Sequence, residues 1–148
     1  MSFEIDILKY TKGVTNVLHF TADDAKDSPG HKIPSVDMYD ARLRISFPNG
    51  ESTIHHDIQV TLNETMEIKI RQQWSMENAV NTKIFLGDVE IFSKRNPNPK
   101  SYKNVRCYIG NPWQDAAHVI IKNLTYERVP YIIGTFIQFY TKSRINAQ

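Results

Sequence analysis

The sequence predicts an all-β protein, an antiparallel β-sandwich, on three observations. Apolar and polar residues alternate with a period of two, as in "ARLRISF" (41–47), where Leu43, Ile45 and Phe47 alternate with polar residues. Turn-forming groups such as Pro48-Asn49-Gly50 separate these runs. No run has a convincing helical period. About ten short strands with such turns are typical of a sandwich or a barrel.

The expected strands follow one another along the chain with short connections. Residues 3–10 and 65–71 alternate isoleucines with charged side chains, as 41–47 does, and the runs from 79 to 95 are divided by Gly87-Asp88. Residues 131–139 are almost wholly apolar, which favours a buried strand. The full set of expected strands is 3–10, 16–21, 41–47, 52–60, 65–71, 79–87, 89–95, 103–110, 118–127 and 131–139.

Length and charge limit the classes of function. A chain of 148 residues can bury one core, so residues 1–148 are expected to form a single domain, with 128–148 as an extra C-terminal strand. The net charge is +2 and basic residues are dispersed, which argues against nucleic acid as a partner. The longest apolar run is shorter than the roughly 20 residues of a membrane-spanning helix. The first residues lack the pattern of a secretory leader, which leaves a cytoplasmic protein or a mature secreted form.

A family resemblance lies in a series of segments along the chain. These are "NVLHFT" (16–21), a loop ending in Lys32-Ile33-Pro34, "LRISF" (43–47), the Asn49-Gly50 turn, "TMEIKIRQ" (65–72), "VEIFS" (89–93), "NPKSYKNVRCYIGNPWQDAA" (98–117) and "IKNL" (121–124). The series resembles a module of secreted invertebrate proteins that is similar to laminin-G, concanavalin-like and galectin-like sandwiches. The resemblance covers about residues 3–127. It implies a jelly-roll sandwich, secretion, sugar binding with galactosides among the candidates, and calcium as a possible cofactor. Asn111 stands where such modules usually carry Asp, and an amide is a weaker calcium ligand because it lacks the charge.

Trp113 has two interpretations, a plug of the core or a platform for a sugar. It follows an expected strand at one end of the sandwich, where loops carry binding sites. Its neighbours Asn111, Gln114 and Asp115 supply donors and acceptors for hydroxyl groups, while an indole stacks on the apolar face of a pyranose. Trp74 is a second candidate platform.

A polar ladder is expected on the strand 52–60. The period of two places His55, Asp57 and Gln59 on one face and His56 on the other, so the two histidines cannot share a metal. The ladder fits a solvated face, a sugar site or, less well, zinc. Asp23, Asp24 and Asp27 form an acidic loop that fits a solvated turn or a calcium site.

Three further features have structural and functional interpretations. Cys107 shares a strand face with aliphatic residues, which favours a buried thiol over a disulfide between subunits. Asp88 and Glu90 are expected two apart on one strand face, but Ser93 stands where a catalytic triad of acids would continue, so ion pairing is favoured over glycosidase activity. Asn63-Glu64-Thr65 and Asn123-Leu124-Thr125 match the N-glycosylation motif, which has meaning only after secretion.

These observations favour a lectin: glycan binding without catalysis, by a secreted protein that pairs as a homodimer. An adhesion or assembly module that binds protein through its sandwich and C-terminal strand is the alternative, and a degenerate glycoside hydrolase is the third.

Overall fold

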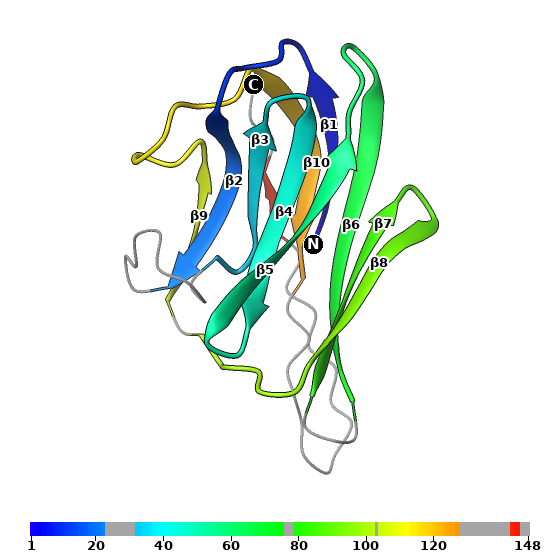
Figure 1. Ribbon diagram of the computed structural model, residues 1–148, viewed down its shortest axis with the longest axis vertical. Coiled ribbons are helices and arrows are strands. Elements are labelled where there is room, and N and C mark those ends of the chain that lie inside the picture. Colours follow the sequence, from blue (N-terminus) through cyan, green and yellow to red (C-terminus); the bar gives the residue numbers. More distant parts are fainter. Residues whose placement is uncertain (23–31, 76–78, 103, 128–142, 146–148) are drawn as a thin grey trace.

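Two antiparallel β-sheets lie face to face in the computed structural model (Figure 1). It describes residues 1–22, 32–75, 79–102, 104–127 and 143–145. Within these ranges eleven strands and no helix are formed, which confirms the predicted all-β sandwich. The strands are β1 (Ser2–Ile7), β2 (Val14–Ala22), β3 (Ser35–Tyr39), β4 (Arg42–Asn49), β5 (Ser52–Gln59), β6 (Thr65–Trp74), β7 (Val80–Leu86), β8 (Val89–Asn96), β9 (Val105–Ile109), β10 (Val119–Tyr126) and β11 (Ser143–Ile145).

The strand order divides the chain between the layers. One sheet has six strands in the order β11-β10-β1-β6-β7-β8, and the other has five in the order β5-β4-β3-β2-β9. Neighbours in both sheets pair antiparallel. Sequence neighbours form hairpins such as β4–β5 and β7–β8, whereas β1–β10 and β2–β9 join distant parts of the chain.

The hydrophobic core lies between the sheets and follows the predicted alternation. Leu43, Ile45 and Phe47 of β4 are fully buried, and so is Ile68 of β6 in the facing sheet. Apolar side chains of both sheets form one cluster, because each strand turns every second residue inward. The largest fully buried side chains are Phe3, Phe47, Ile5, Ile7, Leu18, Met38, Leu43, Ile45, Ile68, Ile84, His19 and Val17.

Strand β3 was not among the expected strands. It follows Pro34, and Val36 and Met38 point into the core while Ser35 and Asp37 are buried on the opposite face. Because β3 is the central strand of its sheet, it has two hydrogen-bonded neighbours, which its short sequence does not reveal. The expected strand 131–139 and the acidic loop with Asp23, Asp24 and Asp27 lie outside the described residues.

Candidate functional site

The polar ladder lies on the outer face of the five-stranded sheet. The register of β4 and β5 sets Arg44 opposite Asp57, Ser46 opposite His55 and Arg42 opposite Gln59. Since Leu43 and Ile45 point into the core, these side chains point away from it. The prediction that His55, Asp57 and Gln59 share one face is therefore confirmed.

His56 points to the opposite side of β5. Its ring lies 4.8 Å from that of Phe92, which belongs to β8 of the other sheet. The adjacent histidines therefore lie on opposite faces, as the strand period predicts.

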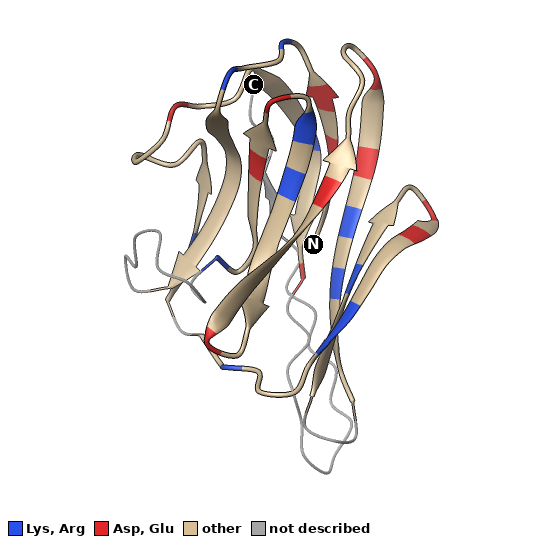
Figure 2. Cartoon of the chain, in the orientation of Figure 1, with Lys and Arg blue, Asp and Glu red and all other residues tan. Residues whose placement is uncertain are grey.

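A bidentate ion pair forms the centre of the ladder. Arg44 donates through Nε to Asp57 Oδ1 at 2.7 Å and through Nη2 to Oδ2 at 2.8 Å. The guanidinium also lies 4.6 Å from the centre of the Tyr39 ring. The hydrogen bonds from Arg44 lower the pKa of Asp57, and the same bonds raise the pKa of Arg44, so both groups are charged at neutral pH. Figure 2 shows the basic positions of β4 between acidic positions on β3 and β5.

Arg42 adds a second guanidinium to this face. Its Nη1 lies 4.0 Å from Asp57 Oδ2, and 59% of its side chain is exposed, against 21% for Asp57. The outer face thus offers one ordered guanidinium–carboxylate pair and one exposed guanidinium.

A buried network of polar side chains links β3, β2 and the loop after β9, beside the polar ladder. Asn16 donates through Nδ2 to Asp37 Oδ1 at 2.7 Å, and Ser35 donates through Oγ to Asp37 Oδ2 at 3.1 Å. Asn16 Oδ1 in turn accepts from the backbone N–H of Asn111 at 2.9 Å. The network fixes the loop 110–118 to the sheet. Tyr39, Asp37 and Asn16 were absent from the sequence-predicted site, because only strand pairing brings them beside β4 and the loop.

Trp113 is half-buried and its ring packs on the same outer face. It meets His19 and Tyr108 edge-on, at 5.6 Å between ring centres in both pairs. His19 and Tyr108 are register partners on β2 and β9, and His19 also pairs with Ser35. β2 and β4 are two strands apart, about 10 Å at the usual strand spacing, and the outward side chains between them, Ser35 and Asp37 of β3, are buried. The indole thus packs against the sheet with one part of its surface and is exposed to solvent with another.

The neighbours of Trp113 shape its loop. Asn111 is buried: its Oδ1 accepts from the Trp113 N–H at 3.0 Å, and its Nδ2 donates to Gln114 Oε1 at 2.8 Å. Gly110, with φ of +67°, starts the turn. Asn111 therefore holds the turn that positions Trp113, whereas the exposed side chain of Asp115 stands beside it.

Trp74 lies apart from this surface. It ends β6 in the six-stranded sheet, at the bottom of Figure 1, whereas the loop after β9 lies at the upper left. The two tryptophans are therefore not parts of one site.

The carboxylates considered for catalysis each contact a lysine. Asp88 accepts from Lys69 at 2.9 Å, and Glu90 accepts from Lys83 at 2.7 Å. The expectation that Asp88 and Glu90 lie two apart on one strand was wrong, because Asp88 belongs to the β7–β8 turn. Ser93 is exposed on β8. The Lys83–Glu90 contact is a cross-strand ion pair, and the Lys69–Asp88 contact joins β6 to the turn.

Cys107 is exposed, which corrects the prediction of a buried thiol. It shares a face with Val105 and Ile109 as predicted, but β9 is the edge strand of its sheet. Partial desolvation by its surroundings still raises the pKa of the thiol to about 11.

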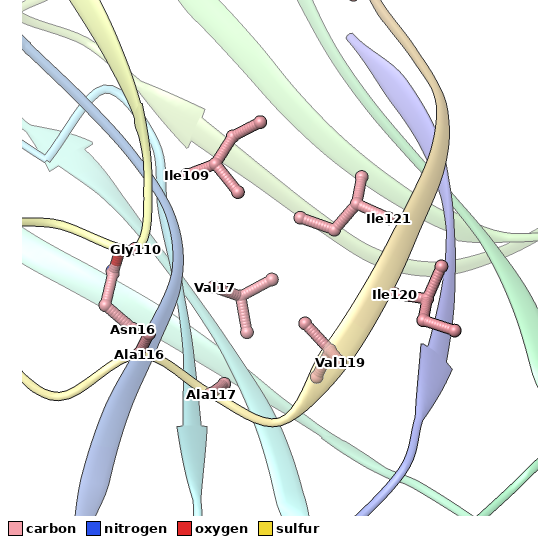
Figure 3. Close-up of a pocket in the computed structure, with 9 residues that line it drawn as sticks. All are labelled: Asn16, Val17, Ile109, Gly110, Ala116, Ala117, Val119, Ile120 and Ile121. Atoms are coloured by element: carbon pink, nitrogen blue, oxygen red, sulfur yellow. The ribbon is translucent and has the colours of Figure 1, made fainter. Parts of the chain in front are cut away.

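An apolar pocket of about 140 Å³ opens beside β9. Figure 3 shows Val17, Ile109 and Ile121, from β2, β9 and β10, around the same space. Ile109 is 43% exposed and Ile120 40%, and β10 pairs with β11 only from Leu124 to Tyr126. This side of the described sandwich presents apolar side chains at strand edges.

In the described part of the chain, no three or more His, Cys, Asp or Glu side chains lie close enough to hold a metal ion. Nor does any helix there have the length and apolarity to cross a membrane. No protein-family model, curated protein or solved structure matches the sequence or the fold of this chain.

Proposed function

We propose that this chain is a glycan-binding protein without catalytic activity, whose site is the outer face of the five-stranded sheet between Arg42 and Trp113. The observation that carries the proposal is the bidentate Arg44–Asp57 pair, half-buried on the outer sheet face beside the ring of Tyr39. The loop with Trp113 borders the same face.

The pair suits neighbouring sugar hydroxyls. A guanidinium has five N–H donors, of which Arg44 uses two on Asp57, and each carboxylate oxygen retains a lone pair. One hydroxyl can donate to Asp57 while the next accepts from Arg44. Because each side chain holds the other in place, little side-chain entropy is lost on binding. The ring of Tyr39 or Trp113 can then cover the apolar face of the sugar.

The resemblance of residues 98–124 to secreted sandwich modules supports two accompanying proposals: the protein acts outside the cell, and galactosides are the first sugars to test. We also propose that two copies associate. If calcium is used, Asp23, Asp24 and Asp27 are the residues to substitute first. A chelator added to the binding assay tests for that requirement.

Glycan-array binding of wild type and two matched variants tests the site. Asp57→Asn removes one ion-paired carboxylate from the proposed site, and Glu90→Gln removes another from the outer face of the other sheet. A hydrogen bond to a charged group contributes about 1.5–3 kcal/mol, so Asp57→Asn should weaken binding roughly 10- to 100-fold. Glu90→Gln should leave binding unchanged. Absence of binding to any glycan, or equal effects of the two variants, would refute the proposal.

A second candidate function, assembly through a protein interface with a second copy of this chain, is favoured by the exposed apolar side chains at β9 and β10. Exposed aliphatic side chains beside strand edges that have no partner among the described residues are typical of protein interfaces. Ile109→Lys should then abolish self-association in sedimentation analysis, whereas Val89→Lys, at an exposed valine of β8, should not. If Ile109→Lys abolishes association and no glycan binds, the assembly function replaces the lectin.

A further inference from the structure

The two N-glycosylation motifs occupy different surroundings in the fold. Asn63 and Glu64 lie in the connection between β5 and β6, at the top of Figure 1, Thr65 begins β6, and all three residues are exposed. Asn123-Leu124-Thr125 lies within β10, where Leu124 is buried in the core. We propose that Asn63 carries an N-linked glycan in the secreted protein and that Asn123 does not. This inference rests on the proposed extracellular location.

Asn63 presents its amide to solvent. Its φ of +59° places it in a left-handed turn, and its backbone N–H donates to Ile7 O at 2.9 Å. Among the described residues its side-chain amide makes no hydrogen bond. A turn is also the conformation in which an acceptor segment can leave the surface and enter another protein's active site.

Thr65 completes the motif at the first position of β6. Its hydroxyl donates to Asp6 Oδ1 at 2.6 Å, and this contact lies at the exposed end of the strand.

Asn123 is exposed and has a similar φ of +52°, but it is held by the sheet. Its Nδ2 donates to Glu4 Oε1 at 2.9 Å, and Thr125 Oγ1 lies 2.6 Å from Ser2 Oγ. Thr125 pairs with Ser2 of β1 on one side and with Arg144 of β11 on the other. The motif can leave the sheet only if Leu124 leaves the core and two strand pairings open. Folding of β10 therefore competes with modification at Asn123.

The modification uses a sugar donor of the secretory pathway, an oligosaccharide on a lipid diphosphate. Asn63 Nδ2 bonds to the anomeric carbon of the first sugar, and the bond from that carbon to the phosphate oxygen breaks. The amide proton passes to a base and the lipid diphosphate leaves. The product carries a bulky polar group at the end of the sandwich.

The test is expression behind a secretory leader in eukaryotic cells, with intact mass measured before and after peptide N-glycosidase, in both medium and cell extract. Wild type and Asn123→Gln should carry one glycan, and Asn63→Gln should carry none. Thr65→Ser keeps the motif and should keep the glycan, whereas Thr65→Ala should lose it. Thermal unfolding of the deglycosylated variants checks that each is folded. An unmodified wild type, or a glycan at Asn123, would overturn the inference. The mass readout is independent of glycan binding, so failure of the lectin proposal does not affect it.

Discussion

Replacing Trp113 with alanine measures how much its indole contributes to the stability of the fold and how much it contributes to glycan binding. The ring has two edge-on aromatic contacts, with His19 at 72° and Tyr108 at 64°. Such pairs contribute about 0.5–1.5 kcal/mol each. Truncating a fully buried tryptophan costs about 3–5 kcal/mol, and Trp113 is only half-buried. Both considerations place the expected loss near 2 kcal/mol.

The assays are denaturant unfolding and thermal unfolding, run beside glycan binding. For a chain of this length each kcal/mol shifts the Tm by about 2–4 °C, so Trp113→Ala should lower the Tm by roughly 4–8 °C. Trp113→Phe keeps an aromatic ring against His19 and Tyr108 and should recover most of this loss. If Trp113 also covers a sugar, its alanine variant should bind about tenfold more weakly while still folded.

Two results would contradict this reasoning. A stability loss below about 0.5 kcal/mol would show that the aromatic contacts do not hold the loop, since even one such pair is worth that much. Unchanged glycan affinity in a folded Trp113→Ala variant would remove the indole from the binding site and leave Arg44 and Asp57 as its centre.

Three other predictions follow from backbone conformation and protonation. Asp57→Asn should make the free energy of unfolding depend less on pH in the acid range. Because the pKa of Asp57 is lowered in the folded state, its ionised carboxylate stabilises the fold above about pH 4, and this stabilisation is lost as the pH falls through the lowered pKa. Urea unfolding at several pH values measures the difference. Cys107 should react with thiol reagents about tenfold faster after unfolding at pH 7.5. Unfolding lowers the pKa of the thiol from about 11, which raises the thiolate fraction about a hundredfold, while the nucleophilicity of each thiolate drops about tenfold. A reaction rate of the native protein that does not rise with pH would count against this. Gly110→Ala should lower the free energy of unfolding by at least about 1–2 kcal/mol, because residue 110 has a positive φ. The loss should exceed that of Gly13→Ala, since a Cβ at position 110 meets that of Ala116 at 3.1 Å while position 13 is open. Equal losses in denaturant unfolding would refute the role of this contact.

The sequence by itself determined most of the described strands and the direction of their side chains, but it did not reveal β3. Alternation sets Leu43 and Ile45 inward and Arg44 outward, and it separates His55 from His56, because successive residues of a strand point to opposite faces. These properties are local, so they can be predicted without knowing which strands are neighbours.

Only the tertiary structure decided what each face meets. Cys107 points inward as predicted yet is exposed, because β9 lies at a sheet edge. Arg44 meets Asp57, and Asn16 meets both Asp37 and Asn111, through strand pairings and loop contacts between residues up to 95 positions apart. The candidate site depends on these long-range pairings. A period of two fixes the face of each residue, but it carries no information about its cross-strand partner.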